Sequence, residues 1–123
     1  MVEMSRQVPG LDEMSGFPRR DEVPFDSDRM RFSTLHETHS GLILYTKGAL
    51  ETVLPLCTHV QLQDGESKPL TQEWRDRYVQ AQGAMADDGL RVLALAYRSV
   101  AEGYDHAALV QDLTLTGLVG LDD

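Results

Sequence analysis

Residues 89–97 are Gly-Leu-Arg-Val-Leu-Ala-Leu-Ala-Tyr, and they contain the longest apolar run of the chain. After Arg91 the run is apolar, and its length is typical of a strand. It therefore predicts a central strand at 91–97 that is buried on both faces. An arginine at the start of such a strand is costly unless it faces a partner or a cleft, so Arg91 is a candidate site residue.

The segments on either side of this strand are predicted to be a helix before it and short elements after it. Thr71 is typical of a helix N-cap, and Gly89 of a helix end. Between them lies an apolar stripe with spacings of 4, 3 and 4, made of Trp74, Tyr78, Ala81 and Met85. After Gly103 we expect a short helical piece at 107–110 and a closing strand at 113–121.

Further upstream, the sequence predicts a hairpin. Residues 29–36 alternate with a period of two, which is the pattern of a half-buried strand. Residues 42–46 are of strand-forming types, and the polar segment 37–41 between them predicts a five-residue loop. A short helix should follow Lys47, and Pro55 must shorten or bend it.

The remaining segments complete an α+β domain. Residues 1–7 are interpreted as the tail of a helix, 9–24 as a surface connection and 61–68 as a polar turn region. The predicted fold is a mostly antiparallel sheet with helices packed on it. The N-terminal helix tail and connecting segment take residues 1–24, and the domain core takes 25–123.

Composition excludes several classes of protein. The chain has 123 residues, with 11 Lys and Arg against 20 Asp and Glu, so its formal net charge is −9. A general nucleic-acid binder needs net positive charge, so no nucleic acid is expected as a partner. The longest apolar run, 92–97, is far short of the ~20 residues of a membrane span. The start of the chain lacks the shape of a secretory signal, and a single cysteine, Cys57, allows no internal disulfide and favours a cytosolic compartment.

Several kinds of active site are also discounted. The phosphate-binding Gly-x-x-x-x-Gly-Lys-[Ser/Thr] and dinucleotide-binding Gly-x-Gly-x-x-Gly motifs are absent from the sequence. The His-Glu-Thr-His segment at 36–39 is one residue too short for a zinc-protease motif, so no metal site is predicted. Cys57 is interpreted as a small buried thiol. Because no acid/base pair of carboxylates stands out, no catalytic residue is predicted.

A few residues could together hold a phosphorylated ligand. Lys47 precedes Gly48 and a short helix, where N–H groups and a positive dipole end favour anions and a glycine admits a ligand close to the backbone. Arg91 adds a second cation, and Phe25 offers a ring on which a base can stack. The residues alone leave other interpretations open, since Lys47 could be an exposed strand end, Arg91 an ion-pair partner and Phe25 a core or edge aromatic.

Four segments, in the same order, resemble segments of the P-type cation-transporting ATPases. Residues 23–33, Val-Pro-Phe-Asp-Ser-Asp-Arg-Met-Arg-Phe-Ser, resemble the family's hydrophobic-Pro-Phe-x-Ser-x-x-Lys-Arg-Met-Ser segment. Residues 45–51, Tyr-Thr-Lys-Gly-Ala-Leu-Glu, resemble its Lys-Gly-Ala-Pro-Glu element. Residues 89–96 match its Gly-Leu-Arg-x-Leu-Ala-x-Ala strand, and 113–123 resemble the segment that leads into its Asp-Pro-Pro-Arg hinge.

The resemblance implies the nucleotide-binding (N) domain of such a pump, an excised part of an ATP-driven cation-translocating hydrolase. It implies ATP as the substrate nucleotide, with Mg²⁺ expected only in the full-length enzyme. The implied partners are an adenine nucleotide and the phosphorylation, actuator and transmembrane domains of the parent pump. The implied location is the cytoplasmic side of an integral membrane protein, with the fragment itself soluble and without turnover. The overall pattern is closest to calcium-pump-like members, although ion selectivity resides in membrane helices that this sequence does not contain.

The resemblance also implies a nucleotide-binding set: Phe25, Met30, Lys47, Gly48, Ala49, Arg91 and Leu93. Phe25 would stack on adenine, and Lys47 would lie at the mouth of the adenine pocket. Leu93 would form part of the pocket floor, and Arg91 would reach the polyphosphate. The pocket wall would be lined by Gly48 and Ala49.

This sequence departs from the family's motifs at two positions. Met30 stands where the family often has lysine, so one phosphate contact is lost or is taken by Arg29 or Arg31. Leu50 replaces a proline, which loosens the start of the helix without removing its dipole. The alternative to a nucleotide-binding domain is a non-enzymatic α+β interaction module that docks through the edge of its hairpin, residues 29–46.

Overall fold

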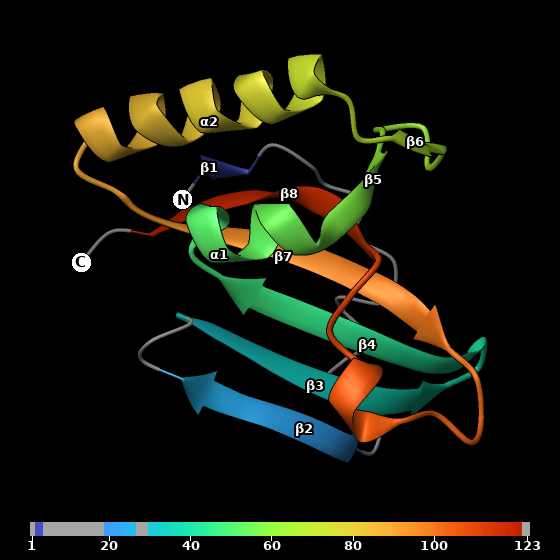
Figure 1. Cartoon of the computed structure of the whole chain (residues 1–123). Helices are drawn as coiled ribbons and strands as arrows, with labels where there is room; N and C mark the ends of the chain where they lie inside the picture. The colour runs from blue at the N-terminus through green and yellow to red at the C-terminus, as the bar shows by residue number, and fades with distance from the viewer. Residues whose placement is uncertain (1, 4–18, 27–29, 122–123) are drawn as a thin grey trace.

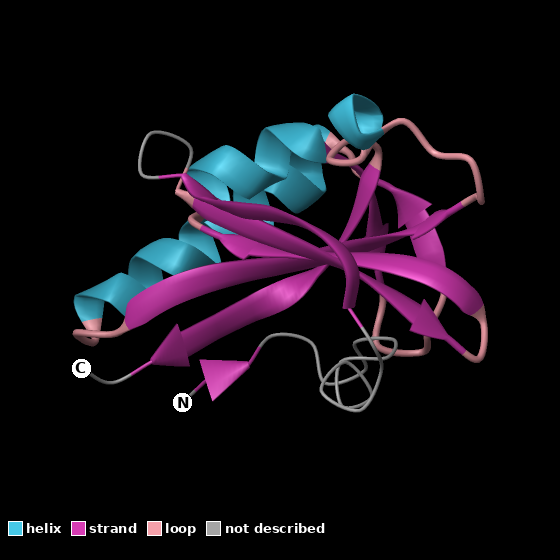
Figure 2. Ribbon diagram, turned by 90° about the horizontal axis from the view of Figure 1, so that it is seen from below, coloured by secondary structure: helices cyan, strands magenta, loops and turns pink. Residues whose placement is uncertain are grey.

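The computed structural model describes residues 2–3, 19–26 and 30–121, in which eight strands form one sheet with helices on one face (Figure 1). Viewed along the sheet, the helices lie on the same side of the strands (Figure 2). The elements in chain order are β1 Val2–Glu3, β2 Arg19–Asp26, β3 Arg31–Thr38, β4 Gly41–Gly48, α1 Leu50–Val53, η2 Leu54–Leu56, β5 Cys57–Gln61, β6 Ser67–Pro69, α2 Gln72–Asp87, β7 Arg91–Val100, η3 His106–Ala108 and β8 Leu113–Leu121.

The sheet is mixed but mostly antiparallel. Its strand order is β2-β3-β4-β7-β8-β5-β6, and β1 pairs with β8. Every neighbouring pair runs antiparallel except β5 and β8, which run parallel. The predicted α+β class, with a mostly antiparallel sheet covered by helices, is confirmed.

Strand β7 is central, as the sequence predicts, with β4 on one side and β8 on the other. Its burial differs between the two faces. Ala94 and Ala96 are buried on the helix-bearing face, whereas Leu93 and Leu95 on the other face are half-buried and Arg91 is exposed. The prediction of burial on both faces is therefore wrong for the second face, because the described helices cover only one side.

The hydrophobic core lies between the sheet and the helices. Helix α2 contributes Tyr78 and Met85, and α1 contributes Leu50 and Val53. The predicted N-cap of α2 is confirmed, since the Thr71 side chain accepts a hydrogen bond from the backbone N–H of Trp74 at 3.3 Å. None of the helices in the described part of the chain has the length and apolar character that a membrane span requires.

The hairpin is confirmed, but its predicted five-residue loop is wrong. Strands β3 and β4 pair as far as Thr38 opposite Gly41, so only two residues, His39 and Ser40, connect them. The Thr38 hydroxyl donates to the carbonyl of Gly41 at 2.8 Å and accepts from the N–H of Ser40 at 3.1 Å. Gly41 has a φ of 101°, which a glycine adopts without strain. The polar residues Glu37, Thr38 and Gly41 therefore belong to the two strands and not to the loop. The hydrogen bonds of the Thr38 side chain stabilise the two-residue turn.

Other corrections concern segments for which the sequence predicts irregular structure. Residues 19–24, placed in the surface connection, form most of the edge strand β2, where Pro24 falls within a register shift of the pairing with β3, a position that a strand proline tolerates. Residues 57–61, of which only Gln61 falls in the predicted turn region, form β5, and β6 begins within that region. Of the predicted helix tail at 1–7, Val2–Glu3 is a strand paired with β8, and the rest lies outside the described residues.

The hairpin does not present a docking edge. Strand β3 pairs with β2, and β4 pairs with β7, so both hairpin strands have neighbours on both sides. The alternative, an interaction module that docks through the edge of the hairpin, therefore has no such edge in the described structure.

Candidate functional site

Three of the predicted site residues lie on one face of two neighbouring strands. Lys47 of β4 pairs with Leu95 of β7, and side chains along a strand alternate between its faces. Leu93 and Arg91, at positions i−2 and i−4 from Leu95, therefore share a face with Lys47. This is the face opposite α1 and α2, and we call its end defined by Phe32, Lys47, Arg91, Leu93 and Leu95 the cationic end.

The cationic end combines exposed charge with partly covered apolar surface. Lys47 and Arg91 are exposed, whereas Leu93, Leu95 and Phe32 are half-buried. Apolar surface of this kind suits a flat ring, and the two cations suit an anion. The chemistry of this end therefore fits a ligand with an aromatic part and a negatively charged part.

The centre of the same face is closed by packed side chains. Thr34, His36 and Tyr45 are buried, and Nε2 of His36 lies 2.9 Å from the hydroxyl of Thr34. The His36 ring meets the Tyr45 ring edge-on, with 5.9 Å between centroids. His36, part of the segment compared above with a zinc motif, is thus a packed strand residue.

Gly48 is close to the neighbouring strand. A Cβ at Gly48 would lie 2.8 Å from the Cα of Arg31 and would overlap the carbonyl oxygen of Met30. The sequence predicts that this glycine admits a ligand to the backbone, but here the close approach is made by the chain itself.

The short helix after Gly48 also has a weaker dipole and fewer free N–H groups for binding an anion than the sequence predicts. Helix α1 has four residues, and the Ala49 N–H at its start donates to the carbonyl of Met30 at 3.0 Å. A four-residue helix has little dipole, so the predicted anion site at this N-terminus is not supported. The contribution of Gly48 and Ala49 to a pocket wall stays a prediction.

Met30 lies just before β3, in the left-handed conformation with a φ of 55°, and its side chain is 45% exposed. Of the two arginines predicted to replace its missing phosphate contact, Arg29 lies outside the described residues. Arg31 pairs with Gly48 and so faces the helix-bearing side, where its guanidinium donates to the carbonyl of Thr52 at 3.5 Å. Arg31 therefore cannot take over a contact on the face of Lys47.

Phe25 belongs to β2, between Val23 and Asp26, where the register with β3 shifts. Its side chain lies outside the described part of the structure. Because Asp26 pairs with Arg31, and Arg31 with Gly48, this end of β2 lies at the same end of the sheet as Gly48. Arg91 is three residues beyond Ala94, the partner of Gly48, or roughly 10 Å further along β7.

Sequence reasoning missed two residues of the cationic end. Phe32 and Leu95 flank Lys47 directly in the sheet, one in β3 and one in β7. The alternation of 29–36 already placed Phe32 on one face with Met30, but only the register between strands shows that this is also the face of Lys47.

Cys57, outside the cationic end, has the predicted character. It is buried, and its Sγ donates to the carbonyl of Val53 at 3.3 Å. Burial raises the pKa of its thiol to about 12, an effect only partly opposed by the charge of Arg75. A thiol with so high a pKa is a poor nucleophile at neutral pH.

Comparison with known proteins assigns the family. A model of the family "P-type ATPase, cytoplasmic domain N" matches residues 4–123. A calcium-transporting ATPase of Bacillus cereus is 38% identical over 106 residues, which is 85% of this chain and 12% of that protein. The human calcium-transporting ATPase type 2C member 1 is 37% identical over 119 residues, which is 93% of this chain and 12% of that protein.

This chain therefore spans about 12% of the length of these curated relatives. The match to the family model extends across nearly all of its residues, including every strand from β2 to β8. The chain belongs to the P-type ATPase cytoplasmic domain N family.

Proposed function

We propose that this chain binds an adenine nucleotide at the cationic end and holds ATP for phosphoryl transfer to a separate domain of an ATP-driven calcium or cation pump. The observation that carries the proposal is the placement of Lys47, Leu93 and Arg91 on one face at one end of the sheet. The family assignment and the calcium-transporting relatives support the same function.

In this proposal the base and the phosphates use different parts of the cationic end. The adenine lies against the apolar surface of Leu93, with Phe25 stacking on it and Lys47 at the mouth. Arg91 is further along β7 and exposed, so it can reach the polyphosphate and pair with its oxygens through the planar guanidinium. Such a site binds and orients a nucleotide. Phosphoryl transfer depends mainly on the positioning of the phosphates, so this is the role expected of the binding domain.

The described side chains do not suit a Mg²⁺ ion. The charged groups that define the cationic end are cations, whereas Mg²⁺ is held by carboxylate oxygens. In residues 2–3, 19–26 and 30–121 there is no group of three His, Cys, Asp or Glu side chains that could hold a metal. We therefore assign no metal to this chain and no step of the reaction to one.

The proposed partners follow from the same role. A domain that only holds the nucleotide needs a phosphorylation domain with an acceptor aspartate, and the Asp-Lys-Thr-Gly motif is absent from this sequence. Actuator and transmembrane domains would complete the pump, with this chain on the cytoplasmic side of the membrane.

A titration with AMP, followed by amide NMR signals, tests the proposed site. Signals of Phe25, Lys47 and Arg91 should shift, and Lys47→Ala should weaken binding. Lys68→Ala is the matched control, because Lys68 is also exposed but lies in β6, at the opposite edge of the sheet from β2. Shifts confined to other surfaces, or equal weakening by both lysine variants, would contradict the proposal.

The relative affinities of AMP, ADP and ATP test the division between base and phosphates. In the proposed site, contacts with the adenine base provide most of the binding free energy. The dissociation constants of AMP, ADP and ATP should therefore differ by no more than about tenfold, which is ~1.4 kcal/mol. ATP bound a hundredfold more tightly than AMP would show that the phosphates dominate.

A further inference from the structure

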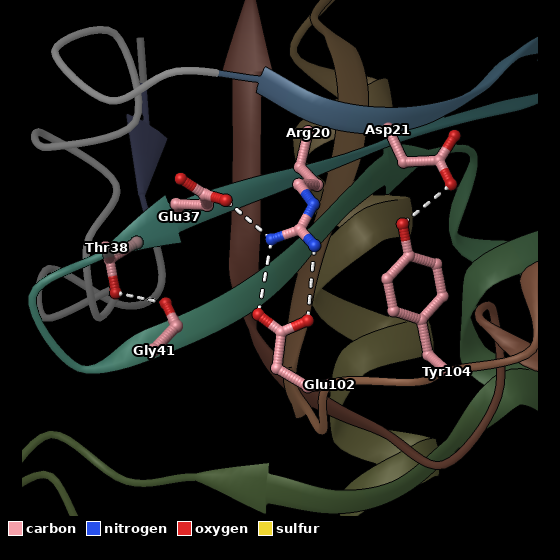
Figure 3. Close-up of polar contacts among 7 residues, drawn as sticks. All are labelled: Arg20, Asp21, Glu37, Thr38, Gly41, Glu102 and Tyr104. Carbon is pink, nitrogen blue, oxygen red and sulfur yellow. Dashed lines mark hydrogen bonds and ion pairs between the residues drawn. The ribbon is translucent and has the colours of Figure 1, made fainter.

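Two consecutive residues of β2 bind the connection between β7 and β8 (Figure 3). The Arg20 guanidinium donates to both carboxylate oxygens of Glu102, at 3.2 and 3.3 Å, and also pairs with Glu37 of β3. The Asp21 carboxylate accepts a hydrogen bond from the hydroxyl of Tyr104 at 3.0 Å. It also lies 3.0 Å from Nδ1 of His106. We call Arg20, Asp21, Glu102, Tyr104 and His106 the β2 clasp.

The connection that the clasp holds is itself firmly attached. Arg98 of β7 donates to the carbonyl oxygens of Ala108, Leu109 and Gln111, at 3.4, 3.2 and 3.1 Å. The Leu109 side chain is only 1% exposed and belongs to the hydrophobic core. The clasp therefore ties β2 to a fixed part of the domain.

Apart from the clasp, strand β2 is held by its pairing with β3. It is an edge strand, and β3 is its only neighbour among the described strands. Its pairing with β3 is interrupted by register shifts between Arg19 and Asp21 and between Val23 and Asp26. The clasp joins residues that are 82 to 85 positions apart in sequence, so it restrains β2 independently of that pairing.

We propose that Arg20 and Asp21 are positioning residues that, through the β2 clasp, hold β2 and hence Phe25 in place for the nucleotide. The inference rests on the proposed function. Asp21 pairs with Leu35 of the buried core, so the clasp lies on the helix-bearing side of the sheet, away from the face of Lys47. Phe25 is four residues further along the same strand, roughly 13 Å from Asp21. The clasp thus acts on the ligand only through β2.

The test compares AMP binding and amide hydrogen exchange in three single variants of the full chain. Arg20→Gln and Tyr104→Phe each weaken the clasp at an exposed or half-buried side chain, so the fold should survive. Each should speed amide exchange in β2 and raise the dissociation constant of AMP by about two- to fivefold, the range expected for such surface pairs. Arg77→Gln is the control, because it removes the same charge and an ion pair with Glu73 on α2, away from β2.

A double-mutant cycle separates positioning of Phe25 from a general effect on the fold. In a Phe25→Leu background, which keeps an apolar side chain but no ring, Arg20→Gln should no longer weaken AMP binding. Equal weakening in both backgrounds would overturn the inference, as would Arg20→Gln and Tyr104→Phe variants that bind AMP as tightly as the wild type. If the wild type itself does not bind AMP, the proposed function fails and the inference falls with it.

Discussion

Gly48 has a packing role that a single substitution can test. Its missing side chain lets the backbone of Met30 and Arg31 approach, and a Cβ added at this position would lie only 2.8 Å from the Arg31 Cα. Gly48→Ala should therefore lower the free energy of unfolding by about 1–3 kcal/mol, because backbone atoms cannot easily move aside. The midpoint of urea unfolding measures this change.

Gly83→Ala is the matched control for that substitution. Gly83 lies inside α2, and a Cβ there would have no other atom within 4 Å. This change should stabilise the domain by about 0.5–1 kcal/mol, because alanine loses less backbone entropy in a helix. If both substitutions stabilised the domain, the close contact at Gly48 would be wrong.

Two buried groups predict loss of stability in alkali. Burial raises the pKa of Cys57 from 9.0 and that of Tyr78 from 10.0, each to about 12. The fold therefore favours their neutral forms, so their contribution to stability is complete below pH 9 and is lost as the pH rises toward 12. The urea midpoint should therefore fall as the pH rises from about 9 to about 12.

Substitution of these two groups gives the control for alkaline unfolding. In a Cys57→Ala, Tyr78→Phe double variant, the alkaline fall in the urea midpoint should be smaller than in the wild type. The same fall in both proteins would assign the effect to other groups.

Single residues of the candidate site are predictable in type but not in arrangement. Lys47 and Arg91 stand out by their places at a strand end and a strand start, and Leu93 by the family resemblance. Their common face follows from the pairing of Lys47 with Leu95, which joins distant parts of the chain and leaves no local signal. The face of Arg31, one of the alternatives for the missing phosphate contact, likewise depends on how β3 pairs.

The edge strand β2 should respond to acid through Asp21. The pKa of Asp21 is lowered from 3.8, chiefly by the hydrogen bond with His106 and then by the N–H of Glu22, with a smaller contribution from Tyr104. The fold favours the charged carboxylate, so its contribution is present above pH 3.8 and is lost as the pH falls through the lowered pKa. Near neutral pH, Asp21→Asn should therefore unfold at lower urea than the wild type, and this difference should shrink below pH 3.8.

Asp76→Asn is a suitable control for the acid experiment. Asp76 is an exposed carboxylate on α2, where it accepts a hydrogen bond from Gln72 at 2.9 Å within the same helix. A difference between wild type and Asp21→Asn that stayed constant from neutral pH into strong acid would contradict the role of the charged Asp21.

Elements with a strong local pattern are predictable, and those held by distant partners are not. The hairpin, α2, β7 and β8 follow from alternation, an apolar stripe and apolar runs. Strand β2 carries Arg19, Arg20, Asp21 and Glu22, a composition typical of a loop, and its strand form depends on β3 and on the β2 clasp. Strand β5 is short and lies beside β8, far along the chain, so its sequence alone gives no sign of it.

The whole chain should bind nucleotide without hydrolysing it. The sequence contains no Asp-Lys-Thr-Gly motif to accept the phosphoryl group, so incubation with ATP should give no steady release of phosphate. A phosphate-release assay on pure protein measures this, with Lys47→Ala as the control for contaminating hydrolases. Steady release by the wild type that Lys47→Ala abolishes would show that the chemistry lies in this chain.

The class of the fold is predictable from the sequence, but its topology is not. The order of helices and strands identifies an α+β domain, because each element needs a layer to cover its apolar face. The parallel pairing of β5 with β8 and the return of β1 to the same strand are non-local contacts. They depend on which arrangement buries the most apolar surface, and no short stretch of sequence encodes that choice.

The pairing of Val2 with Gly120 places the first described strand, β1, beside the last, β8 (Figure 1). Residues 2–3 and 119–120 can therefore separate only if the backbone hydrogen bonds between these two strands break. The folding of the last strand thus also fixes the position of a segment more than a hundred residues earlier in the chain.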